Sequence, residues 1–144
     1  MITKHAGRQA AAALRVERAI VELRRGRTVE VHDAYGATAV FAAEGLLVDA
    51  PDAERTVAGS RLLLTAERAD ALGLADSPET VEVALPASTG VDVILTLAGA
   101  TGANDAAVPA DCRVAPGDAK ARAALSLARH ARLLPALLAV PSAP

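Results

Sequence analysis

Arg61 to Leu74 reads R-L-L-L-T-A-E-R-A-D-A-L-G-L, and this stretch decides how the rest of the chain is interpreted. The apolar run Leu62–Leu64 is typical of a short buried strand. Thr65 is a residue type that caps the start of a helix, and Gly73 is the type that ends one. The stretch therefore predicts a strand followed by a short helix, so both kinds of element occur in one domain.

The flanking sequence continues this alternation of helices and strands. Apolar residues at helical spacing predict a helix from about Ala10 to Arg25, stopped by Gly26. Alternation and turn residues predict the remaining elements: strands over Thr28–Val31, Thr38–Ala42, Thr80–Leu85 and Val91–Leu97, a short helix within Asp49–Gly59, a long surface loop over Ala98–Gly117, a final helix capped by Asp118 and ending near Pro135, and a last strand over Leu137–Val140.

Length and composition place these elements in a single unit. The chain has 144 residues, of which 52% are hydrophobic, and this is enough for one core. We expect a single small α/β (α+β) domain over residues 1–140, with helices packed on a mixed sheet. Residues 141–144, Pro-Ser-Ala-Pro, are interpreted as a tail or as the start of a linker.

Four segments in a fixed order resemble a known family. They are R-V-E-R-A-I-V-E-L-R-R-G-R (Arg15–Arg27), V-F-A-A-E (Val40–Glu44), the stretch Arg61–Leu74, and A-A-L-S-L-A-R-H-A-R-L-L-P-A-L-L (Ala123–Leu138). Together they resemble 3,4-dihydroxy-2-butanone 4-phosphate synthase of riboflavin biosynthesis. More closely, they resemble the degenerate synthase-like domain at the N-terminus of some bacterial GTP cyclohydrolase II proteins. The resemblance covers about Leu14 to Val140 and implies the synthase-like fold.

The resemblance also implies that the catalytic groups of the family are missing. Active synthases hold magnesium and the sugar phosphate with an acidic loop, D-D-E-D-R-E-N-E-G-D, where this chain keeps only Asp33 in H-D-A-Y-G-A-T, residues 32–38. Their G-H-T-E-A-A motif supplies a catalytic His and Glu, and those two positions fall on Lys120 and Arg122. Because a hard cation needs several oxygen ligands and a basic side chain cannot replace a carboxylate, we expect no catalytic residue, no metal and no cofactor.

The function that follows from the resemblance is a non-catalytic scaffold, assembly or regulatory domain of a riboflavin-pathway GTP cyclohydrolase II protein. Active synthases are dimers, so the expected partner is a second copy, as a homodimer, or a downstream cyclohydrolase domain. The zinc site of the cyclohydrolase takes three cysteines, whereas Cys112 is the only cysteine here. The alternative is an enzyme or sensor for a phosphorylated metabolite, with rearranged chemistry at Asp33, Lys120 or Arg122.

Charge and composition exclude other classes of partner. Fifteen basic and 17 acidic residues give a net charge of −2, which provides no attraction to nucleic acid or to an anionic membrane. One Phe, one Tyr and no Trp leave few aromatic platforms for stacking bases. No apolar run approaches the roughly 20 residues of a membrane span, and the N-terminus does not resemble a signal peptide. We therefore expect a cytoplasmic protein that binds neither nucleic acid nor membrane.

Several local features suggest sites, and each has a plainer interpretation that we favour. The plainer interpretations are turns, solvated side chains and an inert thiol. The features are a glycine-rich stretch that resembles a phosphate loop (Gly99–Asn104), three histidines (His5, His32, His130), an acidic group (Asp49, Asp52, Glu54), basic residues of the last helix (Lys120, Arg122, Arg129, Arg132) and the thiol of Cys112.

Overall fold

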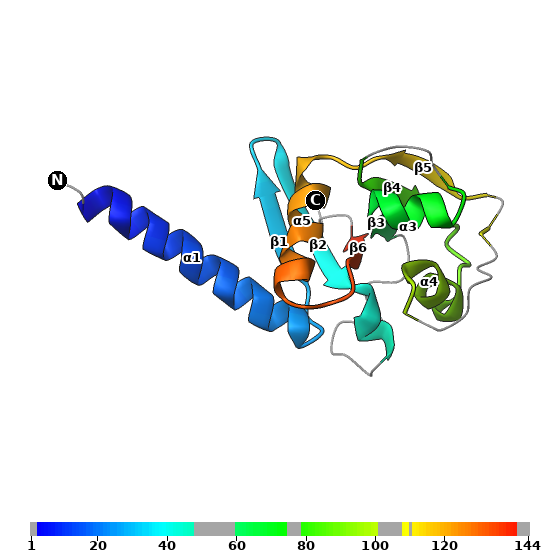
Figure 1. The fold of residues 1–144 in the computed structure, drawn as a ribbon, viewed down its shortest axis with the longest axis horizontal. Helices are drawn as coiled ribbons and strands as arrows, with labels where there is room; N and C mark the ends of the chain where they lie inside the picture. The colour runs from blue at the N-terminus through cyan, green and yellow to red at the C-terminus, as the bar shows by residue number, and fades with distance from the viewer. Residues whose placement is uncertain (1–2, 48–59, 75–78, 101–107, 110, 141–144) are drawn as a thin grey trace.

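The fold is described from a computed structural model, which covers residues 3–47, 60–74, 79–100, 108–109 and 111–140 (Figure 1). Helices and strands alternate along most of the chain, as the sequence predicts. The elements are α1 (Thr3–Arg24), β1 (Val29–Asp33), β2 (Gly36–Ala42), the 3₁₀ helix η1 (Ala43–Leu47), β3 (Arg61–Leu64), α3 (Ala66–Ala71), β4 (Val81–Ala84), α4 (Val91–Ala98), β5 (Arg113–Pro116), α5 (Ala119–His130) and β6 (Ala136–Val140).

A six-stranded sheet in the order β1-β2-β6-β3-β4-β5 forms the centre of the fold. Each of its described pairings is antiparallel, so the expectation of a mixed sheet is wrong, and the domain is an antiparallel α+β fold. The expected last strand is confirmed as β6, and it lies between β2 and β3 rather than at an edge. Because β2 and β3 both pair with β6, this strand joins the β1–β2 hairpin to the β3–β4–β5 half.

The two faces of the sheet are buried under different helices, because successive side chains of a strand point to opposite faces. One face carries Phe41, Leu64 and Leu138, which pack in a cluster with Ile94 and Leu97 of α4. The opposite face is covered by α5, which contributes mostly alanines, and by the end of α1. Its cluster includes Val40, Leu63, Leu137, Leu23, Ala121, Ala124, Leu125 and Ala128. Small side chains let α5 lie close to the strands.

Residues 91–97 form most of α4, so the predicted strand there is wrong. Ile94, Leu97 and Ala98 are buried together, which is the spacing of one helix face and not of a strand. Gly99 follows the helix with a φ of 82°, the left-handed conformation that commonly ends helices. Arg68 of α3 donates from Nε to the carbonyl of Leu97 at 2.9 Å and from Nη2 to that of Thr96 at 2.8 Å.

Both predicted N-caps are confirmed. The hydroxyl of Thr65 accepts a hydrogen bond from the backbone N–H of Arg68 at 3.1 Å, and a carboxylate oxygen of Asp118 accepts one from Ala121 at 2.8 Å. The final helix ends at His130, before the expected Pro135. Within the expected loop, β5 adds an edge strand. The short helix expected in residues 49–59 lies outside the described residues.

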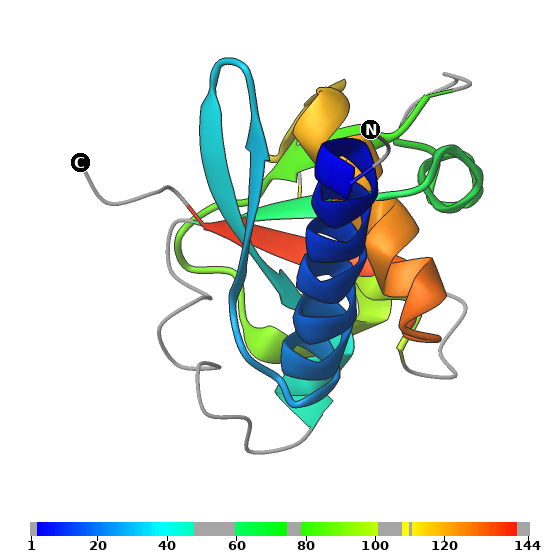
Figure 2. The ribbon, with the colours of Figure 1, turned by 90° about the vertical axis from the view of Figure 1, so that its left-hand side faces the viewer.

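The first helix leaves the body of the domain, as Figure 1 shows, and Figure 2 looks at the domain from the side on which this helix projects. It is confirmed at the predicted place but begins earlier, at Thr3. Residues 7–18 are all exposed, whereas Leu23 near its end is 1% exposed and packs under the sheet. Among the described helices, α1 included, none combines the length and the apolar character needed to span a bilayer.

Candidate functional site

The first hairpin and the start of α5 meet in an ion-pair cluster. Nζ of Lys120 lies 3.2 Å from Oδ2 of Asp33 and 3.4 Å from Oδ2 of Asp118. Asp33 ends β1, and its other oxygen accepts the backbone N–H of Tyr35 at 2.8 Å, which fixes it in the turn. Asp118 caps α5, and Lys120 lies in the first turn of that helix. The fold therefore brings Asp33 and Lys120 together although they are 87 residues apart in sequence.

The environment keeps all three groups of this cluster charged at neutral pH. The backbone N–H of Tyr35, followed by Lys120, lowers the pKa of Asp33 below its ordinary value of 3.8. The N–H of Ala121, followed by Lys120, lowers the pKa of Asp118 in the same way. Asp33, followed by Asp118, raises the pKa of Lys120 above 10.5. A single cation is thus held between two carboxylates.

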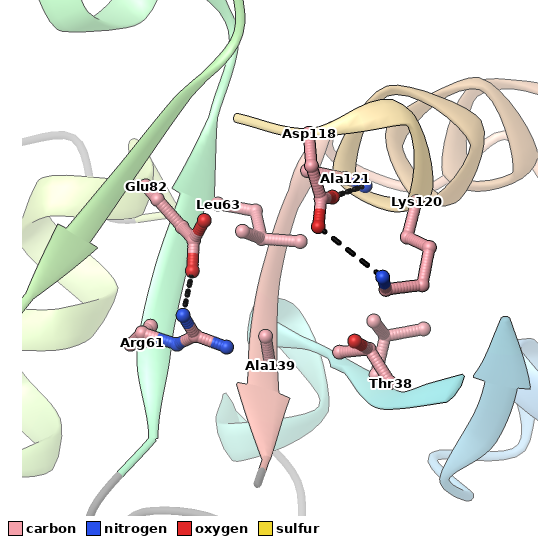
Figure 3. A pocket seen from close by; sticks show the side chains of 9 residues that line it. Thr38, Arg61, Leu63, Glu82, Asp118, Lys120, Ala121 and Ala139 are labelled. Atoms are coloured by element: carbon pink, nitrogen blue, oxygen red, sulfur yellow. Dashed lines mark hydrogen bonds and ion pairs between the residues drawn. The ribbon is translucent and has the colours of Figure 1, made fainter. Parts of the chain in front are cut away.

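A small hollow lies beside this cluster, over the sheet (Figure 3). Its lining includes Thr38, Leu63, Ala139 and a cross-strand ion pair between Arg61 of β3 and Glu82 of β4. The volume of the hollow is about 10 Å³. This is barely the space of one water molecule, so the hollow does not accommodate a sugar phosphate.

No part of the chain that the structure describes brings three or more His, Cys, Asp or Glu side chains together in a way that suits a metal ion. The Nε2 atom of His32 lies 3.2 Å from a carboxylate oxygen of Glu30, and Nδ1 of His130 lies 2.8 Å from the carbonyl of Ser126. Cys112 is half-buried against the core cluster below α4. Residues 49, 52, 54 and 101–104 lie outside the described residues.

A second cleft, which the sequence did not reveal as a unit, lies between α5 and the start of α3. One face of α5 supplies Arg122, Ser126 and Arg129, which are spaced by four and then three residues. The other wall includes Thr65, Ala66, Glu67 and Thr80, and the cleft has a volume of about 270 Å³. Among the described residues, neither arginine has a carboxylate within ion-pair distance, although Arg122 donates to the carbonyl of Gly117 at 3.2 Å. The sequence already places Arg122 and Arg129 among the basic residues of the last helix, but it does not show that the start of α3 forms the other wall.

Glu44, the only carboxylate of the V-F-A-A-E segment, has a structural partner. Its Oε1 atom accepts the backbone N–H of Leu134 at 2.9 Å, 90 residues away in sequence. This bond ties η1 to the turn that leads into β6. The residue therefore serves the fold, because a part-buried backbone donor left without a partner would destabilise it.

Comparisons with protein-family models and with curated proteins gave no match for this chain.

Proposed function

We propose that this chain is a non-catalytic, synthase-like scaffold that serves as an assembly or regulatory domain of a riboflavin-pathway GTP cyclohydrolase II protein. The observation that carries the proposal is the cluster of Asp33, Asp118 and Lys120 between the first hairpin and the last helix. According to the sequence resemblance, this is where an active synthase would hold magnesium and its catalytic His. In this chain the positive charge between the carboxylates is the ammonium group of Lys120 instead of a metal ion.

The geometry opposes metal binding at this cluster. Lys120 is only 14% exposed and lies within 3.4 Å of both carboxylates, so an incoming divalent ion would meet its positive charge at close range. The raised pKa of Lys120 means that it does not release its proton near neutral pH. Both carboxylates already neutralise Lys120, so neither is a free anionic ligand for a divalent ion.

An activity assay tests the proposal. The chain is incubated with ribulose 5-phosphate and Mg²⁺, and formate and dihydroxybutanone phosphate are measured, with an active synthase as the positive control. We expect no release above background. A Mn²⁺ titration followed by electron paramagnetic resonance adds an independent reading, in which the free-ion signal stays unchanged by the protein. Turnover, or one Mn²⁺ bound per chain and lost in Asp33→Asn, contradicts the proposal.

The second candidate function is binding of a phosphorylated metabolite in the cleft between α5 and α3. Arg122 and Arg129 are the observation that favours it, because two guanidinium groups without a carboxylate partner in the described residues suit a phosphate. The hydroxyls of Ser126 and Thr80 add hydrogen-bonding groups, and Glu67 suits a sugar hydroxyl.

A thermal-shift screen with sugar phosphates and nucleotides tests this candidate. It predicts stabilisation that rises with ligand concentration and is lost in both Arg122→Ala and Arg129→Ala. Arg15→Ala, an exposed arginine on α1, is the matched control and retains the shift. A shift that survives both cleft variants, or the absence of any shift, refutes the candidate without affecting the scaffold proposal.

A further inference from the structure

The first helix exposes an apolar line on the side that faces away from the domain. Leu14 and Val21 are 46% and 45% exposed, and they lie seven residues apart, so two turns of helix bring them to nearly the same direction. Leu23, which packs under the sheet, points about 160° away from Val21 at 3.6 residues per turn. Near the end of α1, at Leu23, the body of the domain therefore covers one side of the helix and leaves the opposite side open.

This arrangement calls for a partner on physical grounds. Residues 7–18 are exposed throughout, and a helical segment of that length is marginal in water without packing. Burial of large apolar side chains that are aligned on one helix face is favourable, because it removes their surface from water. Ala10 lies one turn before Leu14 and continues the line toward the N-terminus, and its small side chain permits close approach of a second helix. The exposed face of α1 therefore suits the binding of a partner, and its charges indicate which one.

The charges on this face are complementary to those of an identical face. Glu17 and Arg18 lie between Leu14 and Val21, on opposite sides of the apolar line. When two such helices run parallel about a two-fold axis, the left flank of one meets the right flank of the other. Glu17 of each copy then lies beside Arg18 of the other copy, while Leu14 and Val21 each meet their own counterparts.

We propose that α1 pairs with α1 of a second copy as a short, parallel two-stranded coil. The seam consists of Leu14, Glu17, Arg18 and Val21. Leu23 packs on the side away from this seam, so the two bodies lie on the outside of the pair and do not obstruct it. The polar layer of Glu17 and Arg18 fixes the register at a cost in stability, as polar residues within coiled-coil seams do. This assembly rests on the geometry of α1 and does not depend on whether the domain is catalytic.

Sedimentation equilibrium of the full chain over concentrations from about 1 µM to about 1 mM tests the pairing. We expect a reversible monomer–dimer equilibrium, weak because the seam is shorter than a standard interface. Val21→Glu is expected to weaken dimerisation at least tenfold. Val16→Glu is the matched control, because Val16 is 49% exposed on the same helix but lies about 140° from Val21. Circular dichroism checks that both variants keep their helix content.

Charge exchange makes the test specific to a second copy. Glu17→Arg and Arg18→Glu each place like charges across the seam and are expected to weaken the dimer, whereas the double variant restores opposite charges and the dimer. A mixture of the two single variants forms a heterodimer for the same reason. A wild-type chain that stays monomeric throughout, equal effects of Val16→Glu and Val21→Glu, or a double variant no better than the singles each overturns the proposal.

Discussion

Replacing Gly45 by Ala tests how tightly the core is packed beneath η1. A Cβ atom added to Gly45 would lie 2.7 Å from Cζ and 3.0 Å from Cε1 of the Phe41 ring. Phe41 is fully buried in the core cluster, so its ring can shift only against the side chains packed around it. Overpacking of this kind costs about 1–3 kcal/mol, a large part of a typical stability of about 5–15 kcal/mol. With a urea slope of about 2 kcal/mol per molar, Gly45→Ala lowers the unfolding midpoint by about 1 M.

A double-mutant cycle isolates the ring contact as the cause. Phe41→Leu removes the ring-tip atoms, so Gly45→Ala should cost less in that background, with a coupling free energy of about 1 kcal/mol. Gly7→Ala is the control, since an added Cβ there has nothing within 4 Å. Urea unfolding followed by far-ultraviolet circular dichroism measures all four members of the cycle. If Gly45→Ala shifts the midpoint equally in both backgrounds, the Phe41 ring is not the cause of the destabilisation.

Further predictions concern a helix end, the ion-pair cluster and the central strand. Arg68→Ala removes both hydrogen bonds to the end of α4 and should cost about 2 kcal/mol in urea unfolding, with Arg68→Lys in between; a cost near zero refutes this role. The pKa values of Asp33 and Asp118 are lowered, so the stability that these carboxylates contribute is present above pH 3.8 and is lost as the pH falls through their folded-state pKa values. Asp33→Asn should therefore flatten the acid limb of a Tm-against-pH profile. The pKa of Lys120 is raised, so the stability that it contributes is present below pH 10.5 and is lost as the pH rises through its folded-state pKa. Lys120→Met should therefore flatten the alkaline limb of the same profile, and an unchanged limb contradicts the ion pairing. Leu138→Ala in β6, at a fully buried site, should cost about 2–5 kcal/mol by the same urea assay, and a smaller loss means that the site collapses around the cavity.

The sequence predicts those elements that are fixed by contacts between residues close to one another in the chain. Thr65 and Asp118 cap helices by bonding a backbone N–H three residues ahead, so the residue type and its position were sufficient. Residues 91–97 misled the prediction, because their β-branched and apolar residues suit a strand as well as a buried helix. Packing on the sheet decides between the two, and the side chain of Arg68 closes the resulting helix from a distant element.

The site depended on contacts that no local pattern contains. Asp33 and Lys120 were each identified through the resemblance, but their ion pair requires the first hairpin to fold against α5. The pair of Arg61 and Glu82 requires the register of β3 on β4, in which Leu63 faces Glu82. The order of strands in the sheet could not be predicted from local patterns either. The sequence predicts β6 as a strand, whereas its central place follows from its pairing with β2 and β3.

The central place of β6 has a consequence for biosynthesis. The ribosome completes β1, β2, β3, β4 and β5 before it reaches residues 136–140, and none of the described pairings joins the first two of these strands to the other three except through β6. Until that strand emerges, the nascent chain exposes the edges of β2 and β3 that β6 later covers, and such open edges are templates for wrong pairing. A chain truncated just before Ala136 should therefore aggregate, and a synthetic peptide of the missing strand, supplied during refolding, should compete with that aggregation.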